Sequence, residues 1–424
     1  MSKVRVFLTF FSIIILVQGF NAQTQKSGTL WEMLNTIRKE KFDLILPQAM
    51  RDNKIDMWIH VMQSVNPDFL ALELGGQIAG GRTGYFIFTD RGGDRIERAI
   101  LGGSGDRELY DIFGSVSDIT QFVAERDPRR IGVNFSERFA VSDSISHTDY
   151  LKLVKALGDK YAKRMVSADS LITDFISGRV MSQIVIYGQL CIECAEIIER
   201  EFDKIEPGVT TLRSLSGNVF VNDLDGNQQN NTTYVIQRGD LIGIIHGAGN
   251  RIFETSIGGI AYVLREGETA LPPEVQKIWE HALKTREIFR KNVKVGLTGR
   301  ETLEILIRKL EEAGYVYIDR QKYDRNLDPE KTQVHIDFHT LFGRMPQVED
   351  YNMPRIVGPK GPDCVRNLKI PLFHTFTFEY MVHMPVPEWG RGKHLYICLH
   401  DGVMVTGRGV EFPYPPLKEI RVIR

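Results

Sequence analysis

The hydrophobic pattern of the first part of the chain alternates between two periods. Segments with apolar residues at three-to-four spacing indicate helices, and short apolar runs between them indicate strands. The expected helices are 30–40, 42–53, 149–157 and 171–176, and the expected strands are 57–62, 84–89 and 131–134. This alternation predicts an α/β domain with a mixed sheet that ends near residue 170.

The second part of the chain has a different pattern. A long amphipathic helix is expected over 180–202, where Pro207-Gly208 stops it, and two more helices over 273–291 and 302–313. The late strands are expected over 369–380, 395–399 and 419–423. Helices followed by an antiparallel sheet predict an α+β domain.

One segment between these helices predicts a β-hairpin. Gly239–Leu264 reads GDLIGIIHGAGNRIFETSIGGIAYVL, with apolar runs at 241–245 and 260–264 on either side of a Gly-rich turn. Polar side chains often face a pocket across such a hairpin. Here most of the facing positions are Ile, Ser and Gly, so the hairpin itself carries little chemistry.

The N-terminus has the pattern of an export signal. Lys3 and Arg5 precede an apolar run, Val6–Val17, and Ala22 offers a small residue for cleavage. The sequence therefore predicts a signal peptide over 1–22 and a secreted or periplasmic protein. An uncleaved N-terminal anchor is the alternative. No other segment approaches ~20 apolar residues, so we expect no membrane span after signal cleavage.

Charge and cysteine content weigh against two classes of function. The 53 Lys and Arg residues nearly balance the 54 Asp and Glu residues, which gives no electrostatic reason to expect nucleic acid as a partner. Cys191 and Cys194 form a C-x-x-C inside the long helical pattern, whereas redox motifs place the first thiol at a helix N-terminus. Packing is therefore the favoured role for this pair.

Several stretches together resemble the pita-bread metallopeptidases, the group of Xaa-Pro aminopeptidases, prolidases and creatinases. In chain order they are FDLILPQAMRDNKIDMWIHV, DPRRIGVNFSERFAVSD, EPGVTTLRSL, QRGDLIGIIHG, FTFEY and YICLHDGVMVTGRG. The resemblance covers nearly the whole mature chain. It implies a creatinase-like α/β N-terminal domain over 23–170 and an α+β pita-bread domain over 171–424.

The resemblance also implies where a metal centre would lie. The family holds two divalent cations with two aspartates, a histidine and two glutamates, because several anionic oxygens must offset the repulsion between the cations. The two aspartate positions match Ile245 and Ser256 here, and the final glutamate position matches His400. Ile245 and Ser256 are thus lost ligand positions. Related enzymes often carry an arginine at the position that Gly259 occupies in this chain.

The remaining positions are partly retained. The resemblance places the histidine ligand at His335 and the first glutamate at Glu379. A second histidine, which assists the reacting carbonyl in the family, matches Phe342. With one carboxylate left between them, two divalent ions should not bind, so no catalytic residue of the usual mechanism and no cofactor is expected.

The leading hypothesis is therefore an exported Xaa-Pro aminopeptidase-like protein without two-metal activity, a pseudo-peptidase with a binding role. Its partner would be a peptide or small molecule in the cleft, and the family's habit of dimerising makes a homodimer an option. A purely structural or partner-binding role in an oligomer stays open beside it.

Two enzymatic alternatives also stay open. His335, Glu379 and His400 could converge as a single-metal remnant that binds one zinc or manganese ion, which would make the protein a hydrolase, dipeptidase or aminopeptidase with an unusual ligand set. The metal-free creatinases offer a second route, with His246 or His335 as general base. In the expected hairpin Glu254 is the one carboxylate that could hold their substrate.

Overall fold

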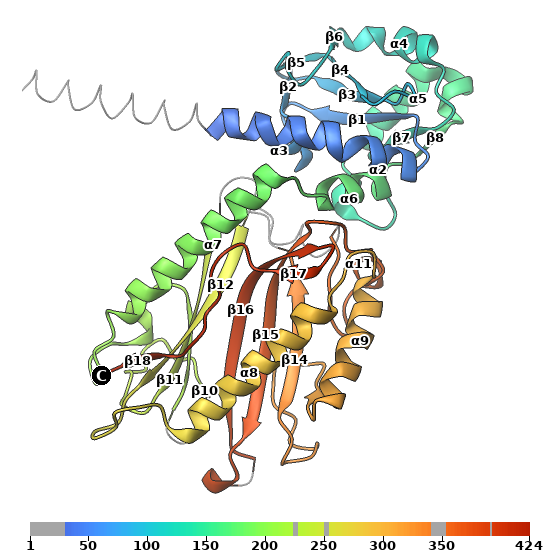
Figure 1. Ribbon diagram of the computed structural model, residues 1–424. Coiled ribbons are helices and arrows are strands. Elements are labelled where there is room, and N and C mark those ends of the chain that lie inside the picture. The colour runs from blue at the N-terminus through green and yellow to red at the C-terminus, as the bar shows by residue number, and fades with distance from the viewer. Residues whose placement is uncertain (1–29, 224–227, 250–253, 341–352, 391) are drawn as a thin grey trace, which may run out of the picture. The chain divides into compact units, whose positions relative to one another are not determined.

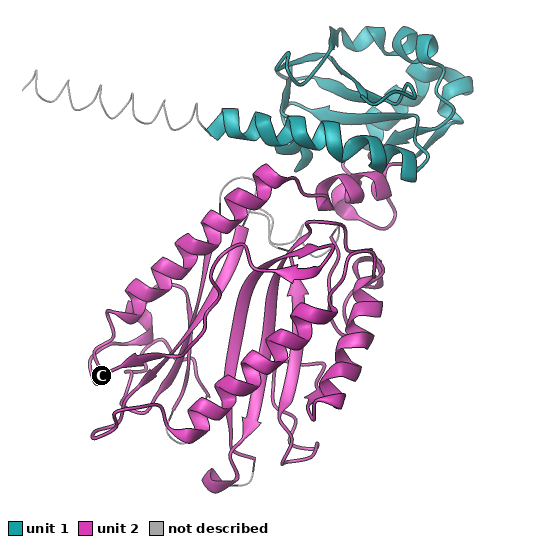
Figure 2. Cartoon of the chain, viewed as in Figure 1, with its two compact units in different colours: residues 1–133, 145–166 teal, residues 134–144, 167–424 magenta. Residues whose placement is uncertain are grey.

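A computed structural model describes residues 30–223, 228–249, 254–340, 353–390 and 392–424. The chain divides into two compact units, residues 1–133 with 145–166 and residues 134–144 with 167–424 (Figure 2). The predicted signal peptide, 1–22, lies outside the described residues, as does Phe342.

The first unit is built on a six-stranded mixed sheet with the order β6-β4-β3-β1-β7-β8 (Figure 1). Its strands are β1 (Met57–Gln63), β3 (Thr83–Thr89), β4 (Glu97–Leu101), β6 (Ile112–Gly114), β7 (Ile131–Val133) and β8 (Met165–Ser167), and β2 (Gly76–Ile78) pairs separately with β5 (Gly103–Gly105). Strand β1 pairs antiparallel with β3 and parallel with β7, which confirms the predicted mixed sheet.

Helices surround this sheet much as the sequence predicts. Residues 30–44 are helical, and the other helices are α2 (Leu46–Asp52), α3 (Leu70–Leu74), α4 (Ile119–Arg126) and α5 (His147–Ala162), with 3-10 turns η1 (Val116–Asp118) and η2 (Ala140–Ser142). The break between the first two helices falls at Ile45, later than expected, because Pro47 fits the first turn of α2 but would interrupt a continuous helix.

The second unit contains two five-stranded sheets, ordered β10-β9-β11-β12-β18 and β13-β14-β15-β16-β17. Strands β12 and β16 lie against each other, so the two sheets form one curled half-barrel (Figure 1). The strands are β9 (Asn218–Asn222), β10 (Gln228–Gln229), β11 (Leu241–Gly249), β12 (Glu254–Val263), β13 (Val316–Tyr317), β14 (Gln333–His339), β15 (Thr375–Pro385), β16 (His394–Thr406), β17 (Gly409–Glu411) and β18 (Arg421–Ile423).

Three long helices pack on one face of the curled sheet, as Figure 1 shows. They are α7 (Met181–Phe202), α8 (Pro273–Asn292) and α9 (Gly299–Glu312), and the shorter helices of the unit are α6 (Asp169–Ser177) and α11 (Asp363–Arg366), with 3-10 turns η3 (Leu212–Ser214) and η4 (Pro387–Trp389). Helix α9 begins three residues before the expected 302, because Thr298 and Glu301 form a capping box at its start.

The helices cover one face of the curled sheet, so strand residues whose side chains do not contact them lie on the opposite face. Phe289 of α8 packs on Phe338 of β14 and Phe378 of β15, with ring centroids 5.0 and 6.4 Å apart, respectively. Successive side chains of a strand alternate between the two faces. Residues 337 and 379 therefore lie on the opposite face of the sheet, which we call the inner face.

Strand β15 begins later than predicted, whereas β12 (from Glu254) and β16 (to Thr406) are longer than their expected 260–264 and 395–399. The segment 369–380 was expected to be a single strand, but β15 begins only at Thr375. Phe373 adopts a left-handed backbone conformation with φ 60°, which is incompatible with a strand and turns the chain just before β15. The apolar run alone does not reveal this turn.

Among the residues that the structure describes, one helix, α7, has the length and the apolar composition to cross a membrane. Half of that apolar window is buried inside the protein, and the helix packs on β11 and β12. Its apolar character is thus used in the core. Cys191 and Cys194 are among its buried residues, and burial is the main cause that raises the pKa of each thiol to about 12.

Candidate functional site

The predicted hairpin is formed by β11 and β12. Ile245 lies opposite Gly258 and Gly247 lies opposite Ser256, so Ile245 and Ser256 are diagonal neighbours on the same face. Thr255, the neighbour of Ser256, contacts Cys191 of α7 on the helix side, which places Ser256 on the inner face. The hairpin therefore presents an alkyl group and a hydroxyl at the positions where the resemblance expects two carboxylates.

Ser256 forms a hydrogen bond with His400 of the neighbouring strand β16. The Ser256 Oγ and His400 Nδ1 atoms are 2.9 Å apart, and both residues are buried, 8% exposed each. Gly258 makes this close approach possible, since a Cβ at that position would lie only 2.9 Å from the backbone nitrogen of His400. The serine thus holds one ring nitrogen of the histidine across the seam between the two sheets.

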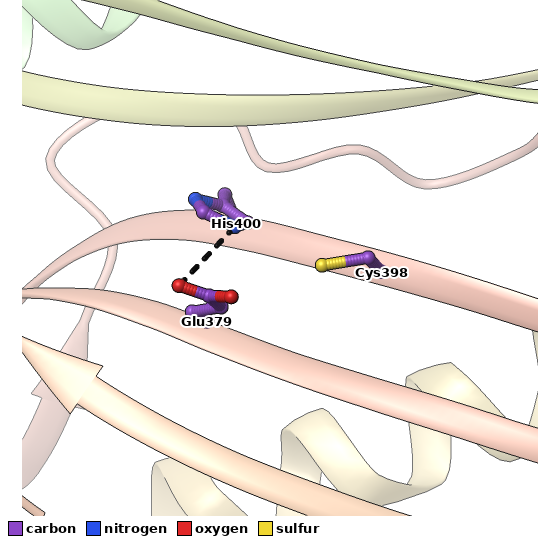
Figure 3. A group of neighbouring side chains, drawn as sticks. All are labelled: Glu379, Cys398 and His400. Carbon is purple, nitrogen blue, oxygen red and sulfur yellow. Dashed lines mark ion pairs between the residues drawn. The ribbon is translucent and has the colours of Figure 1, made fainter. Parts of the chain in front are cut away.

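The other ring nitrogen of His400 points toward Glu379 of β15. These two residues lie directly opposite each other in the β15–β16 ladder, and His400 Nε2 is 3.6 Å from Glu379 Oε2 (Figure 3). Burial disfavours the charged carboxylate, but the contact with His400 outweighs it, so the pKa of Glu379 is below its usual value. Ser256, His400 and Glu379 therefore form a continuous polar row.

Asp337 of β14 extends this row. It lies opposite Glu379 in the β14–β15 ladder and accepts two hydrogen bonds from Arg355, at 2.9 and 2.7 Å. Burial alone would raise the pKa of Asp337, but His339 and Arg355 lower it far below its usual value. Burial alone would lower the pKa of His339, but the hydrogen bond and the negative charge of Asp337 raise it above its usual value. A guanidinium thus already neutralises this carboxylate.

Cys398 lies two residues before His400, on the same face of β16. Its thiol, the His400 imidazole and the Glu379 carboxylate each offer a ligand atom, and these atoms all lie within 4.8 Å of one another (Figure 3). The cysteine is fully buried, which raises the pKa of its thiol well above the usual value. A second such group among the described residues is Asp337, His339 and Glu379.

The residues predicted from sequence are brought together only in part. Glu379 and His400 are in contact, but His335 lies opposite Met381 and binds the carbonyl oxygen of Ile318 through Nδ1 at 3.0 Å. His335 belongs to neither group of potential ligands found among the described residues.

Two residues weighed for a metal-free mechanism, His246 and Glu254, lie on opposite faces of the hairpin. His246 alternates onto the face of β11 opposite to Ile245 and contacts Ser216 Oγ through Nε2 at 3.1 Å. Glu254 lies at the tip of the hairpin, opposite Gly249. By strand alternation Glu254 shares the face of Ser256, whereas His246 is on the other face.

Sequence reasoning did not identify Cys398, Asp337 or Arg355. The spacing of two between Cys398 and His400, and between His335 and Asp337, could have suggested side chains on one face of a strand. Nothing local in the sequence indicates Arg355, which reaches Asp337 from outside the ladder.

A two-metal centre does not fit this face. Of the five ligand positions that the resemblance implies, Glu379 retains its carboxylate on the inner face and His335 its imidazole. Ile245 and Ser256 have no carboxylate, and His400 takes the place of the last one. Asp337 is the added carboxylate, but its oxygens are bound by Arg355. Two dications would find too little free negative charge here.

The sequence matches no family model and no curated protein. The structure, in contrast, is similar to solved structures of peptidases over nearly its whole length. The X-Pro aminopeptidase from Thermotoga maritima shares 15% identity, over 89% of this chain and 100% of that one, with a TM-score of 0.55. The Xaa-Pro dipeptidase from Bacillus anthracis shares 15% identity over 91% and 99%, respectively, with a TM-score of 0.51.

A dipeptidase from Mycobacterium ulcerans gives a further match, with 12% identity over 92% of this chain and 98% of that one, and a TM-score of 0.51. These similarities establish the fold. The chain has the two-domain architecture of the prolidases and Xaa-Pro aminopeptidases, an α/β domain followed by a pita-bread half-barrel, as the sequence predicted. Identities this low mark a divergent member of that fold.

Proposed function

Starting from a pita-bread fold whose inner face lacks the ligands of a two-metal centre, we propose that this chain is an exported pseudo-peptidase with a binding role. The observation that carries the proposal is the hydrogen bond between Ser256 and His400. It joins a hydroxyl and an imidazole at positions where the resemblance implies two carboxylates. The usual hydrolytic water therefore has no pair of metal ions to activate it.

The charges of the inner face support this proposal. Two divalent cations bring four positive charges, and Glu379 and Asp337 bring at most two negative ones. Asp337 is paired with Arg355, and Glu379 lies beside His400. Binding two dications would require breaking the Asp337–Arg355 pair and leaving the guanidinium half-buried next to a metal, which is electrostatically unfavourable.

The ligand class follows from the fold. Two of the solved structures with this architecture are named for X-Pro or Xaa-Pro substrates, and we propose that a peptide or small molecule of similar size binds to the inner face here without being cleaved. Fold alone is an analogy for function, so direct binding is the appropriate test.

Export is the second part of the proposal. The positive residues Lys3 and Arg5 and the apolar run Val6–Val17 support a signal peptide that is removed after Ala22. N-terminal sequencing of the protein from its native host tests this directly. A mature chain that starts at Gln23 is expected, and a chain that retains Met1 would favour the uncleaved anchor.

The activity test uses the full mature chain. Metal-free protein is supplied in turn with manganese, cobalt and zinc and incubated with Xaa-Pro dipeptides and longer Xaa-Pro peptides. We expect no hydrolysis above that of the Glu379→Gln variant. Turnover by the native protein that this variant loses would overturn the proposal and favour a hydrolase with a rebuilt site. Calorimetric titration with the same peptides tests the binding role, and no heat with any of them would contradict it.

A further inference from the structure

Three different ligand types meet on two neighbouring strands of the inner face. Glu379 comes from β15, and Cys398 and His400 come from β16, two positions apart on the same side of the strand. Their carboxylate oxygen, thiol sulfur and ring nitrogen lie within 4.8 Å of one another. Figure 3 shows the three side chains on the two neighbouring strands. Because all three side chains leave from adjacent strands of one ladder, the sheet itself fixes their separation.

The ring nitrogen that faces this group has no hydrogen bond. His400 Nε2 is a buried polar atom without a hydrogen-bond partner among the described residues, and its side chain is only 9% exposed. Its nearest charged neighbour is Glu379 Oε2, at 3.6 Å, which is too far for a hydrogen bond. Buried polar atoms are nearly always satisfied, so an unsatisfied one aimed at a carboxylate and a thiol calls for a ligand.

We propose that Glu379, Cys398 and His400 bind a single zinc ion. Thiolate sulfur, imidazole nitrogen and carboxylate oxygen are the three donor types that zinc uses in proteins, at about 2.0–2.3 Å each. The charges also match, since one thiolate and one carboxylate neutralise one dication. The three ligand atoms already lie within 4.8 Å of one another.

Ser256 would orient the histidine in this site. When a ring nitrogen ligates zinc, the other nitrogen carries the proton and donates it to an acceptor. His400 Nδ1 is 2.9 Å from Ser256 Oγ, so the serine can accept that hydrogen bond and leave the Nε2 lone pair directed at the ion. The hydrogen bond between Ser256 and His400 would thus hold the imidazole in the orientation that binds the ion.

The other candidate groups are less suited to a cation. Asp337, His339 and Glu379 are close together, but Arg355 binds both oxygens of Asp337 and its charge would repel a metal ion. His335, which the sequence pattern favours, uses Nδ1 on Ile318 and lies outside the group. The cysteine also selects the metal, because thiolate prefers zinc whereas manganese prefers oxygen ligands.

Binding would be coupled to a proton. The Cys398 thiol becomes a thiolate as its sulfur–zinc bond forms, and its proton passes to solvent. Three protein ligands leave the fourth tetrahedral position for a water molecule. Glu379 is the most exposed of the three side chains, at 16%, and marks the side from which an ion would enter. The proposal holds whether or not the protein cleaves peptides.

Cobalt provides a direct test, because it substitutes for zinc and a cobalt–thiolate bond absorbs in the near-ultraviolet. Metal-free full-length mature protein is titrated with cobalt and then with zinc under reducing conditions. We expect one cobalt per chain with a thiolate charge-transfer band that zinc bleaches. Cys398→Ser should abolish the band, and Ser256→Ala should weaken zinc binding at least about tenfold.

Matched variants control for misfolding and for other ligands. Cys364→Ser removes a partly exposed cysteine outside the group, and His335→Gln removes the ligand expected from sequence; both should keep the band. Circular dichroism of each variant confirms the fold. A native protein that gives no band, a band that persists in Cys398→Ser, or a band lost in His335→Gln would each overturn the proposed site.

Discussion

Ser256 Oγ lies 2.9 Å from His400 Nδ1, and this contact joins β12 to β16 across the seam of the half-barrel. Both residues stand where the resemblance implies carboxylate ligands. A hydrogen bond between a neutral hydroxyl and an imidazole stabilises the seam in the absence of metal. This hydrogen bond links the two sheets at the place where a two-metal centre would have carboxylate ligands.

The contribution of this contact to stability can be measured. Ser256→Ala leaves His400 Nδ1 buried without its partner, and we expect a loss of about 1–2 kcal/mol in the free energy of unfolding of metal-free protein. In a His400→Leu background the same substitution should cost much less, because the partner is already gone. Urea unfolding of the four proteins measures the coupling, and strictly additive effects would contradict the contact.

The close approach of the two strands predicts a steric effect at Gly258. A Cβ there would lie 2.9 Å from the backbone nitrogen of His400, so Gly258→Ala should push β12 from β16 and cost about 1–3 kcal/mol. Gly247 is a matched control in the same hairpin, since the nearest atom to its added Cβ is 3.5 Å away. Equal thermal stabilities of the two alanine variants would show that the seam is looser than described.

The Asp337–Arg355 pair predicts a double-mutant effect. Arg355→Met leaves the largely buried Asp337 carboxylate without its guanidinium, and we expect a loss of roughly 3 kcal/mol. Adding Asp337→Asn removes the unpaired charge and should restore part of the stability. Chemical unfolding of both single variants and the double variant tests this. If the double variant is as unstable as the sum of the singles, the charges do not act as a pair.

His374 predicts acid sensitivity of the second unit. Burial, with a smaller effect from the charge of Arg179, lowers its pKa in the folded protein to about 3. The neutral form is thus fully stabilising above the unfolded pKa of about 6.5, and this group by itself removes about 1.4 kcal/mol of stability per pH unit as pH falls from there toward 3.

Unfolding free energies between pH 7 and pH 4 measure this slope. His374→Gln should reduce the slope, because this imidazole is gone, while buried His383, whose pKa is also lowered to about 3, still contributes. His147→Gln changes an exposed residue and should leave the slope unchanged. An unchanged slope in His374→Gln would mean that other groups cause the acid sensitivity.

Much of the fold could be predicted because it depends on local patterns. The helices α7 and α8 and the hairpin β11–β12 lie within a few residues of their expected bounds, and the stretches that resemble the pita-bread family occur in the right order. The start of β15 was placed too early, because the chain turns at Phe373 through a left-handed backbone conformation. An apolar residue in the sequence does not indicate such a conformation.

The site was less predictable because its contacts are long-range. The positions of Ile245 and Ser256 in the hairpin could be read from sequence, but the bond from Ser256 to His400 spans 144 residues and depends on how two sheets meet. Cys398 was overlooked because it becomes a neighbour of Glu379 only through the register in which β15 and β16 pair. Arg355 compensates Asp337 from a separate segment, which no local spacing indicates.

We propose that this pita-bread scaffold holds no two-metal centre, and the metal content per chain tests this most directly. Metal-free protein is equilibrated with excess manganese and, separately, with zinc, freed of unbound ion and analysed by inductively coupled plasma mass spectrometry. We predict no bound manganese and no more than one zinc per chain. Two metal ions per chain, both lost in Glu379→Gln, would contradict the account.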